Sequence, residues 1–101
     1  MPYIKQGLRD KLDGQIEALK NTIGEICVDN TEHGILNYVL TQLLTCPNPT
    51  YEYINGVIGV LECSKLEFYR RLAMPYEDNA ASKNGDIMVY KSVDIRYNKD
   101  R

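Results

Sequence analysis

Tryptophan is absent from the 101 residues, and phenylalanine and histidine each occur once. His33, the single histidine, lies beside Gly34 at a predicted helix start, where we expect a surface or capping role and not catalysis. No HExxH, GxSxG or GxxxxGK[ST] motif occurs. The residues therefore identify no hydrolase or nucleotide-binding loop, and the sequence names no reaction.

Cysteine is also scarce. Cys27, Cys46 and Cys63 are odd in number and widely spaced. The odd number and wide spacing argue against a disulfide framework and against a zinc site, because these need paired or clustered cysteines. We expect three thiols in a reducing compartment, no bound metal and no cofactor.

Neither charge sign dominates, and no long apolar run is present. Twelve Lys and Arg against fourteen Asp and Glu give a net charge of -2, which argues against an electrostatic nucleic-acid binder. No apolar stretch is long enough to span a bilayer, and no charged-then-apolar leader opens the chain. The sequence predicts a cytoplasmic protein without a membrane or nucleic-acid partner.

Apolar residues spaced by three and four predict helices over residues 5–28 and 32–45. Asp29 and Asn30 separate the two with turn chemistry. The narrow face of the first helix consists of Leu8, Leu12, Ile16, Leu19, Ile23 and Ile26. The second helix is apolar over about half its circumference.

A third helix is predicted over residues 51–74, with Thr50 as its N-cap and Pro75 as its end. Beyond the Asn84-Gly85-Asp86 turn signal, apolar residues alternate at 87–89 and 93–97, as in short strands. The predicted fold is mainly α: a three-helix domain over residues 1–78 and an extended C-terminal tail over 79–101 with one or two short strands.

The third helix carries a lysine inside its apolar stripe. Lys65 has Glu62 one turn before it and Tyr69 one turn after it. One interpretation is an ion pair whose lysine stem covers apolar neighbours while its ammonium reaches water. The second is a pocket in which Lys65 meets an anionic group and Tyr69 stacks on a ring, and the third is a catalytic lysine.

Three further residues are assigned to this candidate ligand site, Asn37, Tyr38 and Arg70, contributed by neighbouring subunits. Eight tyrosines favour half-buried surfaces such as interfaces and ligand pockets. Arg70 has a second interpretation, because Glu67 precedes it by three residues and the two form a helix-stabilising pair.

Several segments resemble a family of small proteins encoded by bacteriophages and prophages. They are MPYI at the start, GILNYV at 34–39, INGVIGVLECSKLEFYRR at 54–71, PYED ending at Asp78, and NGD at 84–86. The resemblance extends to Asp86. It implies expression in the host bacterial cytoplasm, and it brings no activity and no catalytic residues with it.

These observations together predict a non-enzymatic phage accessory protein that forms a homo-oligomer and binds a ligand or host factor. By analogy with other small phage proteins, we expect an inhibitor of host antiviral defence that sequesters a small anionic ligand, a nucleotide signal. One alternative is a protein–protein inhibitor that adds its tail, residues 87–101, as a strand to a host protein. Another is a small nucleotide-processing enzyme.

Overall fold

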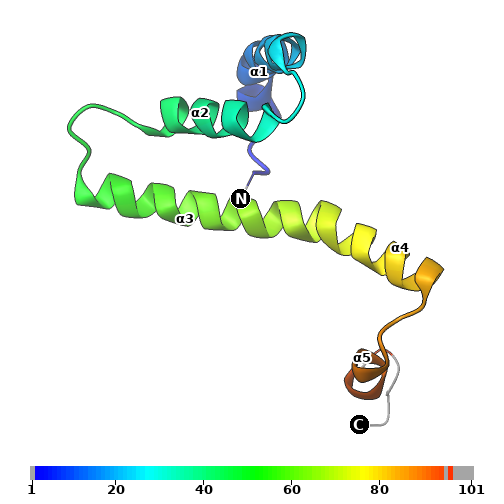
Figure 1. Cartoon of the computed structure of the whole chain (residues 1–101). Helices are drawn as coiled ribbons and strands as arrows, with labels where there is room; N and C mark the ends of the chain where they lie inside the picture. The colour runs from blue at the N-terminus through cyan, green and yellow to red at the C-terminus, as the bar shows by residue number, and fades with distance from the viewer. Residues whose placement is uncertain (1, 95, 97–101) are drawn as a thin grey trace. The chain divides into compact units, whose positions relative to one another are not determined.

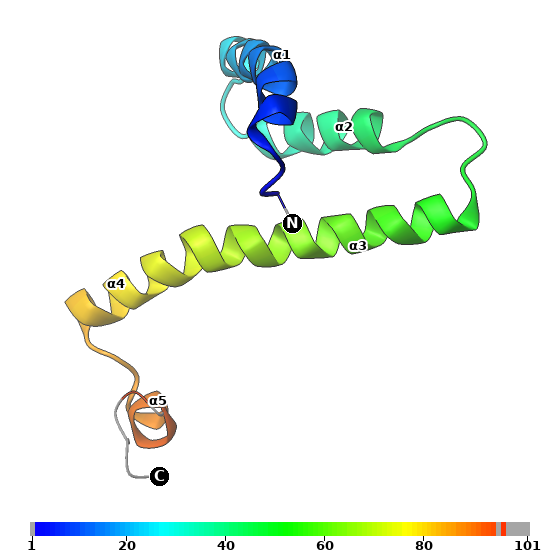
Figure 2. The same cartoon turned by 180° about the vertical axis from the view of Figure 1, so that it is seen from behind.

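A computed structural model of the chain describes residues 2–94 and 96, and these residues form helices and no strand (Figures 1 and 2). The predicted mainly α class is therefore confirmed. In chain order the elements are α1 (Gln6–Ile26), α2 (Glu32–Leu44), α3 (Tyr51–Phe68), the π-helical segment η1 (Tyr69–Ala73), α4 (Met74–Asn84) and α5 (Met88–Val93).

The first two helices begin and end within two residues of their predicted limits. Between them the chain turns at Asn30, whose φ of 64° is left-handed. Asparagine tolerates this conformation because its short polar side chain can bond locally. The hydroxyl of Thr31 also donates to the carbonyl oxygen of Val28 at 2.7 Å, which holds the turn closed.

The connection from α2 to α3 follows its predicted chemistry. Asn48, between two prolines, has a φ of 51° and turns the chain. The backbone N–H of Tyr53 donates to Oγ1 of Thr50 at 3.0 Å, so the predicted N-cap is confirmed. This bond satisfies one of the backbone donors that every helix start leaves without a helical partner.

Pro75 does not end the third helix, and that prediction is wrong. The helical chain passes through η1 into α4, in which Pro75 is the second residue (Figure 1). The preceding turn is π-helical, with the N–H of Met74 bonded to the carbonyl oxygen of Tyr69, five residues earlier. This wider turn accommodates a proline, which has no N–H to donate. The predicted boundary between residues 78 and 79 consequently lies inside α4.

The short strands predicted in the tail are also not found among the described residues. The Asn84-Gly85-Asp86 turn is present, with Gly85 at a φ of 85°, but residues 88–93 form α5. The N–H groups of Tyr90 and Lys91 both donate to the Ile87 carbonyl oxygen, at 3.0 and 3.1 Å. A helix bonds its own backbone in this way, whereas a strand needs a second strand beside it. Ile95 and Tyr97 lie outside the described residues.

The chain divides into two compact units, Met1–Leu61 and Glu62–Arg101. No described residue of either unit is buried in the single chain, although many large apolar side chains are present. The apolar half of α2 is therefore not buried within the single chain. No described helix has the length and apolar character needed to cross a membrane.

Candidate functional site

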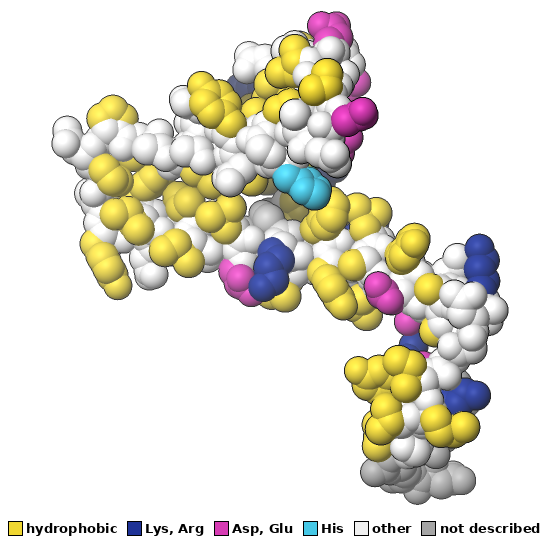
Figure 3. Space-filling model, viewed as in Figure 1, with side chains coloured by type: hydrophobic (Ala, Val, Ile, Leu, Met, Phe, Trp, Pro, Cys, Tyr) yellow, Lys and Arg dark blue, Asp and Glu magenta, His cyan; other side chains and the backbone are white. Residues whose placement is uncertain are grey.

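The first unit contains an apolar groove between α2 and α3. Its volume is about 380 Å³, within the range of small-molecule pockets. Figure 3 shows hydrophobic side chains gathered along these two helices. The lining residues are Asn37, Leu40, Thr41, Leu44, Thr45, Cys46, Pro49, Tyr53, Ile54, Val57, Ile58 and Leu61. None of them is charged.

Tyr53 joins the two walls of this groove. Its hydroxyl donates a 2.6 Å hydrogen bond to the carbonyl oxygen of Leu44, the last residue of α2. That carbonyl is one of the four that a helix end leaves without an N–H partner. The phenol therefore caps α2 from the first turn of α3.

The polar groups at the groove are few. The hydroxyl of Thr41 donates to the carbonyl oxygen of Asn37 at 2.8 Å, so this hydroxyl is engaged within its own helix. The side-chain amide of Asn37 remains as the main polar group of that wall. Such a surface suits an apolar occupant better than a phosphate or a carboxylate.

The second unit contains the predicted lysine. Nζ of Lys65 lies 3.4 Å from Oε1 of Glu62, which confirms that the two residues form the expected pair. Both side chains are exposed, Lys65 by 70% and Glu62 by 57%. Phe68, three residues after Lys65, is exposed by 67%, so the lysine and its apolar neighbour are both largely exposed.

Tyr69 and Arg70 belong to η1. Nη2 of Arg70 lies 2.7 Å from Oε1 of Glu67, as the pairing interpretation predicts. π-helical turns within α-helices are frequent at functional sites. Here the turn places Tyr69, whose side chain is exposed, at the end of the segment that carries Glu62 and Lys65.

Asn37 and Tyr38 belong to α2 in the first unit. Asn37 lines the apolar groove, whereas Tyr38 is exposed and is not among the groove residues. The six predicted residues are thus divided, two in the first unit and four in the second. The groove itself was not predicted. The sequence did predict the two helices that form its walls, α2 from its apolar spacing and α3 from its Thr50 cap.

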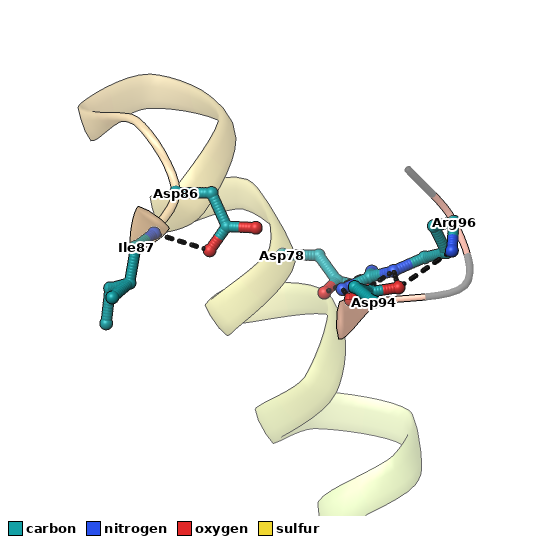
Figure 4. A network of polar contacts seen from close by, with 5 residues as sticks. All are labelled: Asp78, Asp86, Ile87, Asp94 and Arg96. Atoms are coloured by element: carbon teal, nitrogen blue, oxygen red, sulfur yellow. Dashed lines mark hydrogen bonds and ion pairs between the residues drawn. The ribbon is translucent and has the colours of Figure 1, made fainter. Parts of the chain in front are cut away.

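A polar cluster near α4 was also missed. Arg96 bonds Asp94 through Nη2 at 2.6 Å and Asp78 through Nη1 at 3.3 Å (Figure 4). These hydrogen bonds hold the pKa of Asp94 below its ordinary value and raise the pKa of Arg96 above its own. Asp78 and Arg96 are eighteen residues apart, so no helical spacing signals the contact.

The cysteines and acidic residues assemble no metal site in the described part of the chain. No three His, Cys, Asp or Glu side chains within residues 2–94 and 96 lie close enough together to hold an ion. Cys27, Cys46 and Cys63 are all free thiols.

The model of one protein family matches residues 1–87 of this chain. The chain belongs to that family, which is described as Domain of unknown function (DUF6899). No curated protein and no solved structure matches it. The match includes all six predicted site residues and both walls of the groove, and it ends one residue before α5.

Proposed function

We propose that this chain is a phage-encoded, non-enzymatic binding protein that acts as a homo-oligomer in the bacterial cytoplasm. Its role is to inhibit a host antiviral defence by retaining a small anionic ligand, with a nucleotide signal as the best candidate. Glu62, Lys65 and Tyr69 form the ligand-binding segment in each subunit. Asn37, Tyr38 and Arg70 are supplied to it from neighbouring subunits.

The observation that carries the proposal is the amount of exposed surface. No described residue of either unit is buried, and Leu43, Ile58 and Phe68 are each exposed by 60 to 68%. Large apolar side chains are normally covered in a folded protein, and obligate subunit interfaces are rich in them. A homo-oligomer supplies this coverage because every copy offers the same apolar faces.

Coverage of Phe68 would bring Lys65 into the same interface. The two residues lie on one helical face at a spacing of three. An exposed ion pair is worth less than about 1 kcal/mol, so Lys65 can exchange Glu62 for a ligand phosphate at little cost. Inside an interface this ammonium would need an anionic partner, because an unpaired buried charge is unfavourable.

Tyr69 supports the choice of a nucleotide. Its ring lies one turn beyond Lys65 and is exposed, so it is available to stack on a planar base. A phosphate contact and a ring contact about one helical turn apart match the two ends of a nucleotide. The uncharged α2–α3 groove has no such pair of groups, which is why we assign the ligand to the Lys65 segment.

Native mass spectrometry of the protein purified from bacterial cytosol tests this function. We expect a small anionic molecule to remain bound to the oligomer and to be lost from Lys65→Met. Lys11→Met, which removes an exposed lysine of α1, is the matched control and should retain the ligand. A Lys65→Met oligomer that retains the ligand as wild type does would contradict the site, and conversion of added nucleotide would contradict the non-enzymatic role.

A second candidate function is inhibition of a host protein through the C-terminal segment. Met88, Val89, Tyr90 and Val93 are all exposed on α5. Since residues 88–93 form α5, these four side chains would enter a groove of the target as the face of a helix. Deleting residues 87–101 distinguishes the two functions, because it should abolish binding of a host protein and preserve ligand retention at Lys65.

A further inference from the structure

The apolar face of α1 has the spacing of a coiled-coil seam. Leu12, Ile16, Leu19, Ile23 and Ile26 follow one another at steps of four, three, four and three. These steps place Ile16 and Ile23 at heptad position a, and the other three at position d. Of the five, Ile23 alone is not classed as exposed, and the exposed fractions of the others lie between 38 and 57%.

We propose that α1 pairs with α1 of a second copy as a short antiparallel coiled coil. This inference rests on the homo-oligomer of the proposed function and adds the contact that builds it. It does not depend on the ligand or on Lys65.

Little of the first unit covers this seam. Near the end of α1, Lys20, Ile23, Gly24 and Cys27 share a pocket with Glu32 and Leu36 at the start of α2. The preceding seam residues, from Leu12 to Leu19, are all exposed. Gly7, Gly14 and Gly24 weaken the isolated helix, and most of the stability of a helix in a protein comes from packing of its apolar face. In the heptad frame these glycines fall at positions f, f and b, on the side away from the seam, so pairing leaves the seam free of gaps.

Charges beside the seam select the antiparallel direction. Position e holds Asp13 and Lys20, and position g holds Gln15 and Thr22. In an antiparallel pair, e positions meet e positions, so Asp13 meets the partner's Lys20 and Lys20 meets the partner's Asp13. In a parallel pair, g meets the following e, which places Gln15 beside the partner's Lys20 and forms no opposite-charge pair.

The same two residues select the register. Complementary charges require core layers in which Leu12 packs on the partner's Ile23 and Ile16 packs on the partner's Leu19. A shift by one heptad would place Lys20 beside the partner's Lys20. Like charges at this distance are destabilising, so the shifted register is disfavoured.

Charge reversal tests the pairing in the full-length protein. Asp13→Lys and Lys20→Asp each replace two attractive pairs per dimer by two repulsive ones. We expect each to raise the dissociation constant measured by analytical ultracentrifugation about tenfold. The double variant D13K/K20D should recover wild-type association, because it restores opposite charges. Glu17→Lys, at position b outside the seam, is the matched control and should associate as wild type.

Cysteine cross-linking tests the direction, in a background with Cys27, Cys46 and Cys63 replaced by serine. L12C chains mixed with I23C chains should form a mixed disulfide dimer under mild oxidation, whereas L12C chains alone should not. The proposal would be overturned if the single charge reversals had no effect on association, or if the double variant stayed dissociated. Efficient disulfide formation between L12C chains alone would also overturn it. Ligand retention by Lys65 reports on the proposed function separately, since all of these changes lie in α1.

Discussion

The Tyr53 hydroxyl and the Leu44 carbonyl oxygen, nine residues apart in sequence, lie 2.6 Å apart and join the end of α2 to the start of α3. Tyr53→Phe removes the donor and keeps the ring. We expect the free energy of unfolding to fall by about 1 kcal/mol, the usual net value of such a bond. Urea unfolding followed by circular dichroism measures the change. Tyr51→Phe, two residues earlier and highly exposed, is the control; equal effects of the two variants would show that the hydroxyl of Tyr53 does not cap α2.

Thr50 makes a second hydrogen bond in the same connection, in which its side-chain oxygen accepts from the N–H of Tyr53. Thr50→Ala should lower the free energy of unfolding by roughly 1 kcal/mol, because the cap is lost. Thr50→Ser keeps the hydroxyl and should behave as wild type. Amide exchange at residues 51–53 should accelerate in Thr50→Ala alone, and a similar acceleration in the serine variant would contradict capping.

Replacing a leucine of α2 by a charged residue should have a different effect inside and outside the groove. Leu40 lines the groove and Leu43 does not. If the groove is covered in the oligomer, Leu40→Glu places a carboxylate in an apolar contact and should weaken assembly by about 2 kcal/mol or more. Leu43→Glu should change it by less than half as much. Sedimentation velocity distinguishes them, and equal weakening by both would exclude a special role for the groove.

Gly85 ends α4 with a φ of 85° and a ψ of 140°, a region that residues with a Cβ rarely enter. Gly85→Ala should therefore cost about 1–3 kcal/mol in the local stability of α4 and α5, measured by hydrogen exchange. Gly14→Ala is the opposite case, because Gly14 lies in the middle of α1 with open space around it. It should stabilise α1 by up to about 1 kcal/mol. If both alanine substitutions changed the stability in the same direction and by the same amount, the left-handed turn at Gly85 would be contradicted.

Asp94 predicts a local pH dependence. Hydrogen bonds from Arg96 lower its pKa in the folded chain relative to the ordinary value of 3.8. The pair therefore stabilises the folded state above the unfolded pKa, and this contribution disappears as the pH falls through the lower, folded pKa. NMR titration of the Asp94 carboxyl carbon should give a pKa below 3.8. In Arg96→Gln the pKa should rise toward the value in urea; an unchanged pKa would show that Arg96 is not the cause.

Much of the helical structure could be predicted from the sequence because local chemistry specifies it. The limits of α1 and α2, the Thr50 cap and the turns at Asn30 and Gly85 all depend on residues within one or two helical turns. The Glu62–Lys65 and Glu67–Arg70 pairs follow from helical spacing in the same way. Interactions between residues three or four apart need no knowledge of the fold.

The tertiary structure decided what local patterns leave open. The bond from Tyr53 to Leu44 and the contact of Arg96 with Asp78 join residues nine and eighteen positions apart, which only the path of the chain brings together. Pro75 lies inside a continuing helical segment because η1 precedes it. Residues 88–93 bond their own backbone as a helix, and the described residues contain no strand that could pair with them. Apolar spacing determines which face of a helix avoids water. What covers that face depends on packing partners, and these lie beyond the reach of any local pattern.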